Sequence, residues 1–336
     1  MSTSSLSTQA LITASFTISP RGPFSLAEAG TFGFGQRDGR DWDGVMRLAF
    51  CLDGYATHAA AEVRQDAGGE VHLAVFAPAG TDLAAVRDQA ARVLSLDHDA
   101  TEFARIGQRD PVIGRLQAAA PGLRPPLFYS PYEAAAWSVL SARRPARQMM
   151  HLRALLSEAH GRTFDLAGLR LAAFPTPSQL LRVASFPGLP PEKIERLHGV
   201  ATAALEGRLD VSALKDLGPD AAMAELQTIK GIGPFYSALI VIRGTGFTDV
   251  LPVSEPRALA LVAQLYNLPE PPTEDQFRAL AEPWRPFRTW ATVLIRAAGP
   301  RLLCPGTTPR TSRCAPRPAA QLAVTPATRR PEARTR

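Results

Sequence analysis

The sequence predicts a mainly α-helical protein with an α+β N-terminal domain. Four short β-like runs occupy the first hundred residues, and from about residue 110 apolar residues recur at three- and four-residue spacing. The helical segments are short and are separated by connections that contain Pro or Gly, which is typical of a compact helical bundle and not of a coiled coil or a solenoid. At 336 residues, 46% of them apolar, the chain is long enough for a sizeable core in two or three domains.

The N-terminal domain is expected over residues 1–105 as a mixed α/β unit. Its β-like runs are 11–18, 45–51, 58–65 and 70–77. The last two flank an Asp-Ala-Gly-Gly turn, and a run with helical spacing follows at 83–96. This order predicts a small antiparallel sheet covered by a helix.

The helical domain is expected over residues 106–300. Its predicted helices are 131–160, 177–184, 191–206, 220–229, 234–243, 255–266, 273–282 and 286–298. Residues 301–336 lose aromatics and gain Pro, Thr and Arg, so we expect a disordered tail, either inert or adding non-specific affinity for nucleic acid. The tail has eight arginines and one acid, which leaves −1 for the preceding 300 residues out of a total net charge of +6. Bulk charge therefore says little about the folded part.

Several classes of protein are not expected from this sequence. No apolar run approaches the roughly 18 residues that span a membrane, and the N-terminus lacks the features of a secretory signal, so we expect a cytoplasmic protein. The three cysteines, Cys51, Cys304 and Cys314, fit neither a zinc site nor an iron–sulfur cluster. We therefore expect no metal centre of this kind, and we expect a monomer.

Residues 220–243 have the pattern of two short helices joined by a tight turn. Gly231 and Gly233 allow backbone angles and close approaches that other residues do not, and Pro234 suits the first turn of the next helix. The free amides and the dipole of a helix N-terminus form a phosphate site. A lone Gly-x-Gly pattern is equally compatible with an ordinary connection between helices.

A family resemblance is carried by residues 226–252, LQTIKGIGPFYSALIVIRGTGFTDVLP. This segment resembles the helix-hairpin-helix signature of DNA base-excision glycosylases and is most similar to that of DNA-3-methyladenine glycosylase II. Further matching segments follow the family's order at 109–126, 130–141, 174–181 and 281–298. The resemblance covers about residues 105–300 and implies a helix-hairpin-helix glycosylase bundle, and the small antiparallel sheet domain suits the same family.

The resemblance also implies how DNA would be held. In that family the hairpin grips the backbone of double-stranded DNA near the damaged base, often with a monovalent cation on its carbonyl groups and without another cofactor. This carries over to four residues, Lys230, Gly231, Ile232 and Gly233. Phosphate contacts position a protein without reading sequence, which suits a search for damage at any position.

The family's catalytic aspartate lies six residues after an acid that matches Asp249, which leads to Glu255. A fixed carboxylate stabilises the positive charge that develops on the sugar as the base leaves. The side chain of Glu255 is one methylene longer than aspartate, and a misplacement of ~1 Å can lower a rate on the order of 100-fold. The residues alone also fit a helix start, with Ser254 as N-cap and with Glu255 and Pro256 in the first turn.

The resemblance places an aromatic substrate pocket next to this acid. Phe235 stands where lyase-type relatives have a nucleophilic lysine, so the implied enzyme is monofunctional. Phe235 also takes a pocket aromatic position of the family, and Tyr236, Trp137 and Trp290 are either further pocket residues or core residues. Arg296 takes the position of a pocket tryptophan, where it would repel a cationic base, mark a changed substrate or block the pocket.

The turn at 140–145, LSARRP, departs from the family's glycine–glutamine turn, which fills the space left by the extruded base. Arg143 or Arg144 would either take that role in the minor groove or contact phosphate. We expect Arg285 and Arg288 to brace the helical domain.

These expectations together predict a monofunctional DNA glycosylase of base excision repair that hydrolyses the N-glycosidic bond of alkylated purines such as 3-methyladenine. The first alternative is a DNA-damage-binding protein that has lost the chemistry, favoured by Glu255 in place of aspartate, by Arg296 and by the altered 141–145 turn. The second alternative is a helical interaction module without DNA binding.

Overall fold

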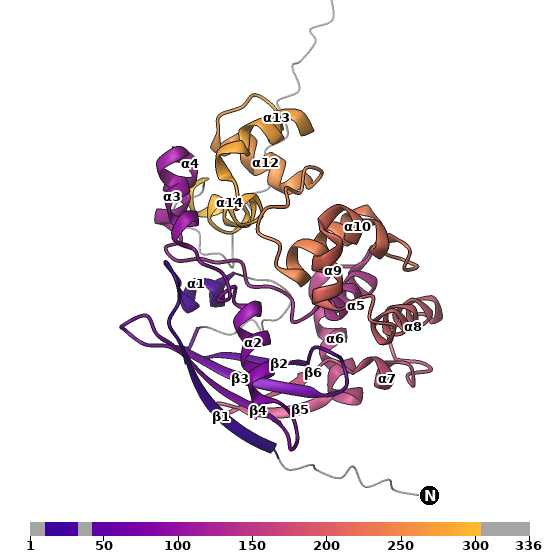
Figure 1. Cartoon of the computed structure of the whole chain (residues 1–336). Coiled ribbons are helices and arrows are strands. Elements are labelled where there is room, and N and C mark those ends of the chain that lie inside the picture. Colours follow the sequence, from indigo (N-terminus) through magenta and orange to yellow (C-terminus); the bar gives the residue numbers. More distant parts are fainter. Residues whose placement is uncertain (1–10, 33–41, 304–336) are drawn as a thin grey trace, which may run out of the picture.

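A four-stranded antiparallel sheet forms one end of the computed structural model, which describes residues 11–32 and 42–303, and two groups of helices form the rest (Figure 1). Its strands are β1 (Leu11–Ile18), β2 (Met46–Cys51), β3 (His58–Gln65) and β4 (Val71–Pro78), in the order β1-β4-β3-β2. The predicted sheet is confirmed, with each strand within one residue of its expected bounds. The expected tail at 304–336, with Cys304 and Cys314, lies outside the described residues.

Helix α2 (Leu83–Val93) covers the sheet, as predicted. Val86, Ala90 and Val93 lie at helical spacing and are buried against the inward-facing residues of β3 and β4. The short helix α1 (Leu26–Thr31) packs beside them. The predicted helix continued to residue 96, but α2 ends at Val93 because Ser95 takes a left-handed conformation with φ 54°.

A β-hairpin lies in a region that the sequence pattern predicted to be almost entirely helical. Its strands are β5 (Arg162–Leu166) and β6 (Leu169–Ala173), joined by a two-residue turn at Ala167 and Gly168 with φ of 42° and 77°. Positive φ at both positions is the geometry that matches the twist of a hairpin. Phe164 and Leu166 point toward the N-terminal sheet, and their alternation is the signal that a helical interpretation overlooked.

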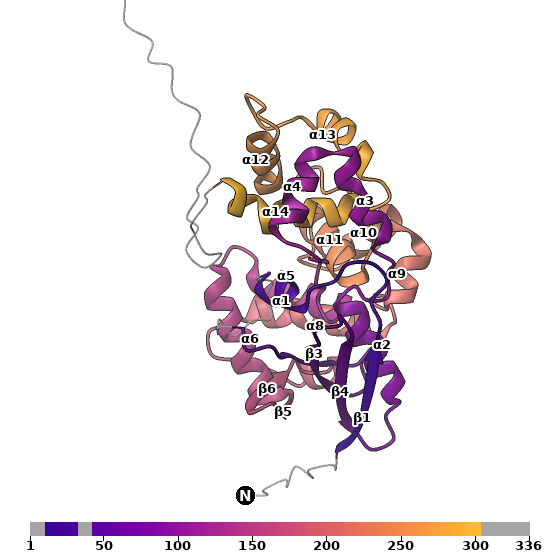
Figure 2. The same ribbon diagram turned by 90° about the vertical axis from the view of Figure 1, so that its left-hand side faces the viewer.

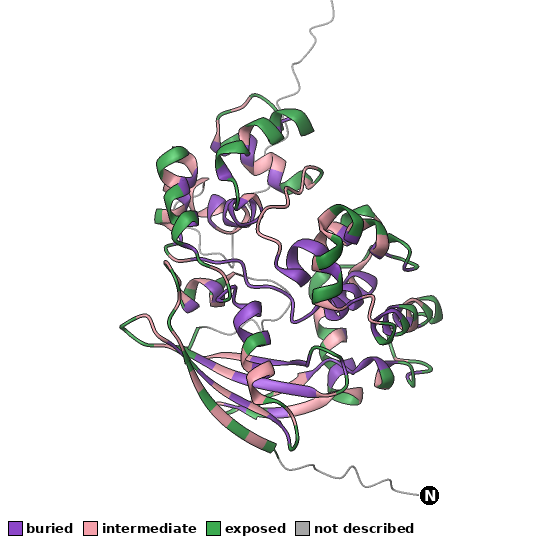
Figure 3. Cartoon of the chain, viewed as in Figure 1, coloured by how far each residue is buried: buried purple, intermediate pink, exposed green. Residues whose placement is uncertain are grey.

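The first helical group lies within residues 131–245. It contains α5 (Pro131–Ser141), α6 (Ala146–His160), α7 (Pro177–Leu180), α8 (Pro191–Leu205), α9 (Val211–Leu217), α10 (Pro219–Gln227), α11 (Pro234–Ile240) and the π-helix η1 (Val241–Thr245). Helix α5 is buried from Pro131 to Leu140 and forms the centre of this group (Figure 3). The single helix predicted at 131–160 is two helices, because the chain turns at 142–145, where Arg143 has φ 57°.

The second helical group joins two parts of the chain that are distant in sequence. It contains α3 (Thr101–Arg109), α4 (Pro111–Ala119), α12 (Pro256–Leu265), α13 (Glu274–Leu280), the 3-10 helix η2 (Glu282–Trp284) and α14 (Arg288–Leu303). Helices α3, α4 and α14 lie side by side in both views (Figure 2). Among residues 11–32 and 42–303, no helix is long and apolar enough to cross a membrane.

The carboxylate of Asp110 ties this second group together. Its Oδ1 accepts hydrogen bonds from the amides of Val112 (2.9 Å) and Ile113 (3.2 Å) at the start of α4. Its Oδ2 accepts from the Tyr266 hydroxyl (2.5 Å) and the Trp284 indole (2.7 Å). One buried side chain thus caps α4 and joins it to the end of α12 and to η2.

His58 makes the stability of the sheet domain dependent on pH. The ring is buried, with Nε2 3.0 Å from the Phe174 carbonyl, and burial lowers the pKa of His58 from 6.5 to about 4. Between pH 6.5 and 4 the unfolded chain therefore binds a proton that the folded chain does not. As the pH is lowered through this window, the free energy of unfolding decreases by about 3 kcal/mol.

Urea unfolding at pH 7, 6, 5 and 4 measures this effect in the wild type and in His58→Gln. The variant keeps an N–H donor for the Phe174 carbonyl but cannot titrate, so its loss of stability with falling pH is expected to be about 3 kcal/mol smaller than that of the wild type. Parallel pH profiles for the two proteins would contradict the assignment.

Candidate active site

A cavity of about 1230 Å³ opens where the sheet domain and the two helical groups meet. Its walls come from β2, the β5–β6 hairpin, α5, α11 and α14, and from the start of α12. Six of the residues that the sequence singled out line it: Trp137, Arg144, Phe235, Tyr236, Glu255 and Arg296. The fold thus brings a candidate acid, aromatic rings and arginines into one space from five separate stretches of sequence.

Glu255 is the N-cap residue of α12. Its backbone is extended (φ −86°, ψ 102°), and its Oε2 accepts a hydrogen bond from the Ala258 amide at 2.7 Å. Ser254, expected to be the N-cap, is therefore one residue too early. The longer glutamate side chain folds back onto its own helix, and the partial positive charge of the helix N-terminus favours a carboxylate at this place.

Arg296, on α14, forms an ion pair with this carboxylate. Its Nη1 lies 2.6 Å from Glu255 Oε2, the same oxygen that accepts from Ala258. The two side chains keep 30% and 19% of their exposure, respectively, so solvent partly screens the pair. Arg296 thus enters the cavity, as the sequence predicted, and there it contacts the candidate catalytic acid itself.

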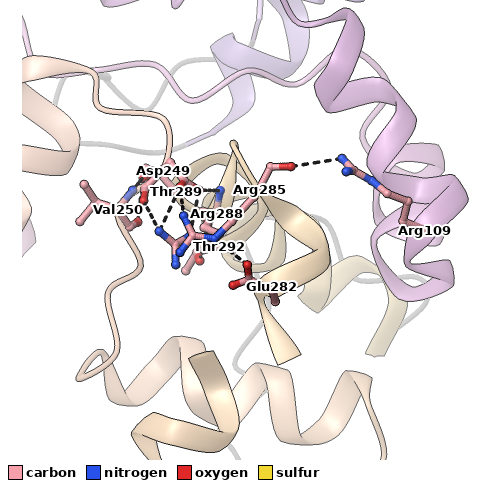
Figure 4. Close-up of polar contacts among 8 residues, drawn as sticks. All are labelled: Arg109, Asp249, Val250, Glu282, Arg285, Arg288, Thr289 and Thr292. Atoms are coloured by element: carbon pink, nitrogen blue, oxygen red, sulfur yellow. Dashed lines mark hydrogen bonds and ion pairs between the residues drawn. The ribbon is translucent and has the colours of Figure 1, made fainter. Parts of the chain in front are cut away.

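Asp249 fixes the segment that leads to Glu255 against α14 (Figure 4). Its Oδ1 lies 2.8 Å from Arg288 Nε, and its Oδ2 lies 3.0 Å from both Arg288 Nη2 and Arg285 Nη1. The Thr289 hydroxyl completes the connection with hydrogen bonds to the backbone of Val250. Arg285 and Arg288 brace this domain, as expected. Through Asp249 they fix the position of Glu255 relative to Arg296 on α14.

Two aromatic side chains of α11 border the cavity beside the acid. The rings of Phe235 and Tyr236 lie 5.3 Å apart in an edge-to-face arrangement, and Phe235 is 52% exposed. Phe235 is exposed whereas Tyr236 is half-buried, so the Phe235 ring is the more accessible of the two to a ligand. Trp137, on α5, also lines the cavity but is only 9% exposed.

Trp290 does not belong to the cavity. It is 2% exposed and packs against Phe103, Phe287 and His98 in the core of the second helical group. The pocket role that the sequence suggested for Trp290 is therefore wrong, because its face of α14 turns toward α3 whereas the face with Arg296 turns toward the cavity.

The predicted hairpin is formed by α10, a tight turn and α11. Gly231 has φ 97°, and a Cβ there would lie 3.0 Å from Arg196 Cδ, so this position needs glycine. Gly233 has φ −96° and open space around it, so it does not share that requirement. Lys230 is exposed and pairs with Glu195 at 2.8 Å, whereas the Ile232 side chain is buried, which leaves only its backbone for a ligand.

The arginine turn, defined as residues 142–145, lies at the rim of the cavity between α5 and α6. Arg143 and Arg144 are both exposed, and Arg144 lines the cavity. Two basic residues of α8, Lys193 and Arg196, stand behind the two turns. Sequence reasoning missed them because single lysines and arginines on a helix carry no pattern that separates them from an ordinary surface. Within residues 11–32 and 42–303, no three His, Cys, Asp or Glu side chains are grouped to hold a metal ion.

Two relatives of this chain are named as DNA-3-methyladenine glycosylases. No family model matches the chain. The DNA-3-methyladenine glycosylase 2 of Escherichia coli is 31% identical over 189 residues, which cover 54% of this chain and 63% of that protein. The DNA-3-methyladenine glycosylase of Bacillus subtilis is 24% identical over 208 residues, which cover 60% and 67%. The chain thus spans about two thirds of the length of these two relatives.

A solved structure shows the same fold. The 3-methyladenine DNA-glycosylase from Archaeoglobus fulgidus superposes with a TM-score of 0.69 at 22% identity, covering 83% of this chain and 96% of that one. The fold, with α10, the tight turn and α11 as its hairpin, is that of the helix-hairpin-helix DNA glycosylases. The resemblance to DNA-3-methyladenine glycosylase II is thereby confirmed.

Proposed function

We propose that the chain is a monofunctional DNA glycosylase of base excision repair that removes alkylated purines, such as 3-methyladenine, from double-stranded DNA. One observation carries the proposal: the Glu255 carboxylate, at the N-terminus of α12, lines the same cavity as two aromatic side chains of α11, the second helix of the hairpin. The names of the relatives support the choice of substrate class.

Glu255 would act once a damaged nucleotide has left the DNA stack and entered the cavity, a step that costs a few kcal/mol. As the bond between base and sugar breaks, positive charge grows on the sugar. The carboxylate, held by the Ala258 amide and Arg296, stabilises that charge and orients the attacking water. Phe235 and Tyr236 offer ring faces on which an electron-poor base stacks.

The hairpin would hold the DNA backbone beside this site. Its turn presents Lys230 and the backbone of Gly231, Ile232 and Gly233, next to the N-terminus of α11, where free amides suit a phosphate. The carbonyl groups of the same turn are the ones that would hold a monovalent cation. Because Phe235 stands where a lyase would need an amine, no Schiff base forms at that position and the DNA strand stays intact.

Substitution of Gly231 by alanine is expected to weaken duplex binding about tenfold. Alanine at φ 97° costs roughly 1–2 kcal/mol and its Cβ meets Arg196, so the turn must change shape. Gly233→Ala is the matched control, since φ there is ordinary and nothing lies within 4 Å of the added Cβ. Fluorescence anisotropy with an abasic-site duplex measures both. Equal affinity for Gly231→Ala and wild type would count against the hairpin as the grip.

Replacement of Arg296 by methionine is expected to raise excision of cationic bases relative to neutral ones about tenfold. The guanidinium neutralises the Glu255 carboxylate, so its removal changes the pair from neutral to negative. At an effective dielectric of about 20 one such charge attracts a nearby cation by a few kcal/mol before solvent screening. Arg257→Met is the control, because Arg257 lines the same cavity but is exposed.

The measurement is the ratio of single-turnover rates on duplexes that carry 7-methylguanine and hypoxanthine. An unchanged ratio in Arg296→Met would show that this arginine does not select the substrate by charge.

A further inference from the structure

The start of α8 contacts both the hairpin, which the proposed function assigns to DNA, and the arginine turn, whose two arginines we expect in the minor groove or on phosphate. Lys193 reaches the arginine turn on one side. On the other side Arg196 lies against Gly231, and Glu195 pairs with Lys230 of the hairpin. Residues 193–196 therefore lie between two surfaces that are far apart in the sequence.

The ammonium group of Lys193 is bound by the end of another helix. Its Nζ donates to the carbonyls of Val139 and Leu140, each at 2.6 Å, and of Ala142 at 3.3 Å. The last carbonyls of a helix have no partner within it, and the helix dipole favours a cation there. Lys193 itself stands near the start of α8, where the dipole of its own helix is unfavourable to a cation. The end of α5 thus accounts for where this side chain lies.

The three carbonyls that Lys193 binds belong to the last residues of α5 and to the first residue of the arginine turn. Arg143 adopts a left-handed conformation, φ 57°, and the Arg144 amide donates to the Ser141 carbonyl at 3.1 Å. Both arginine side chains are exposed. The Lys193 ammonium thus connects α8 to the backbone at the end of α5, and this contact fixes the direction in which the arginine turn leaves α5.

Two further cationic side chains, Arg144 and Arg196, lie near the Lys193 ammonium. Burial lowers the pKa of Lys193, and the charges of Arg144 and Arg196 lower it further. Like charges this close repel one another in the free protein, and a phosphate group between them would relieve the repulsion.

We propose that Lys193 is a positioning residue for DNA damage recognition: its ammonium holds the arginine turn so that Arg143 and Arg144 meet the duplex at a fixed spacing from the hairpin. This role rests on the proposed function. Lys193 need not touch DNA for it, because it acts through the backbone of the turn.

A double-mutant cycle tests the proposal. Lys193→Met keeps the aliphatic stem and removes the ammonium, and is expected to weaken binding to an abasic-site duplex about tenfold. Lys193→Arg, which restores donors, should recover most of that loss, and Lys215→Met on α9 should bind as the wild type does. In an Arg144→Ala background, Lys193→Met should weaken binding by less than a further threefold, because the contact between Arg144 and DNA is already absent. Losses that multiply in the double mutant would overturn the proposal.

Hydrogen exchange of the free protein gives a readout that needs no DNA. Amides of residues 142–148 are expected to exchange at least tenfold faster in Lys193→Met, while those of α12 keep the wild-type rate. Unchanged exchange at 142–148 would overturn the positioning role even if DNA binding falls. If the wild type bound no damaged duplex, the proposed function would fail, yet exchange would still decide whether Lys193 holds the turn. Lys193→Gln replaces the methionine variant should that variant not fold.

Discussion

Replacing Glu255 with glutamine is expected to lower the single-turnover rate of base release at least about 100-fold. Glutamine has nearly the same shape, and its carbonyl oxygen can still accept from the Ala258 amide, so the cap of α12 is kept. What is lost is the negative charge that faces the developing sugar cation, and removal of one such preorganised electrostatic contact costs on the order of 100- to 1000-fold.

Glu255→Asp is the informative companion to this change. It introduces the aspartate that the resemblance implies at this position and keeps the charge, so we expect activity within about tenfold of the wild type. The shorter side chain also tests whether contact with Arg296 at 2.6 Å is needed for activity. Equal rates for Glu255→Gln and wild type would show that Glu255 serves only as a helix cap.

Replacing Asp110 with alanine is expected to lower the free energy of unfolding by about 4 kcal/mol. The change removes the N-cap of α4, worth about 1 kcal/mol, and leaves the Tyr266 hydroxyl and the buried Trp284 indole without their acceptor, at roughly 1–3 kcal/mol each. The lost stability belongs to the second helical group, which includes α12 and α14, the helices that hold Glu255 and Arg296.

Asp110→Asn separates the two contributions. An amide oxygen in place of Oδ1 still caps α4, but the amide nitrogen cannot accept from Trp284, so an intermediate loss of about 2 kcal/mol is expected. Urea unfolding followed by tryptophan fluorescence measures all three proteins. A loss below about 1 kcal/mol for Asp110→Ala would mean that water replaces the carboxylate at little cost.

Local patterns were sufficient for most of the fold. The alternating strands of the N-terminal sheet and the Pro- and Gly-bounded helices follow from periods of two and of three to four residues. The β5–β6 hairpin was missed because five-residue strands inside a helical region give a weak signal, and its stability comes from packing on β2 and β3. The break in the 131–160 helix is not visible in the apolar periodicity, but Pro145 marks it in the sequence, and the resemblance already implied a turn at 140–145.

The candidate site divides in the same way. Glu255, Phe235 and Tyr236 were expected at the site from the family resemblance, and they share the cavity. Trp290 was left open between pocket and core because a helix pattern does not tell which of two buried faces a tryptophan joins, and the structure places it in the core. The ion pair between Glu255 and Arg296, and the reach of Lys193 to the end of α5, join residues 41 and 54 positions apart and depend on the packing of whole helices.

The central claim is that this chain releases damaged bases from DNA without cutting the strand, and one measurement tests it most directly. Methylated duplex DNA is incubated with excess protein, released bases are separated by chromatography, and strands are sized with and without alkali. The account predicts free 3-methyladenine from the wild type, strand breaks only after alkali, and neither product above background from Glu255→Gln. Binding to the methylated duplex without release of any base would contradict it.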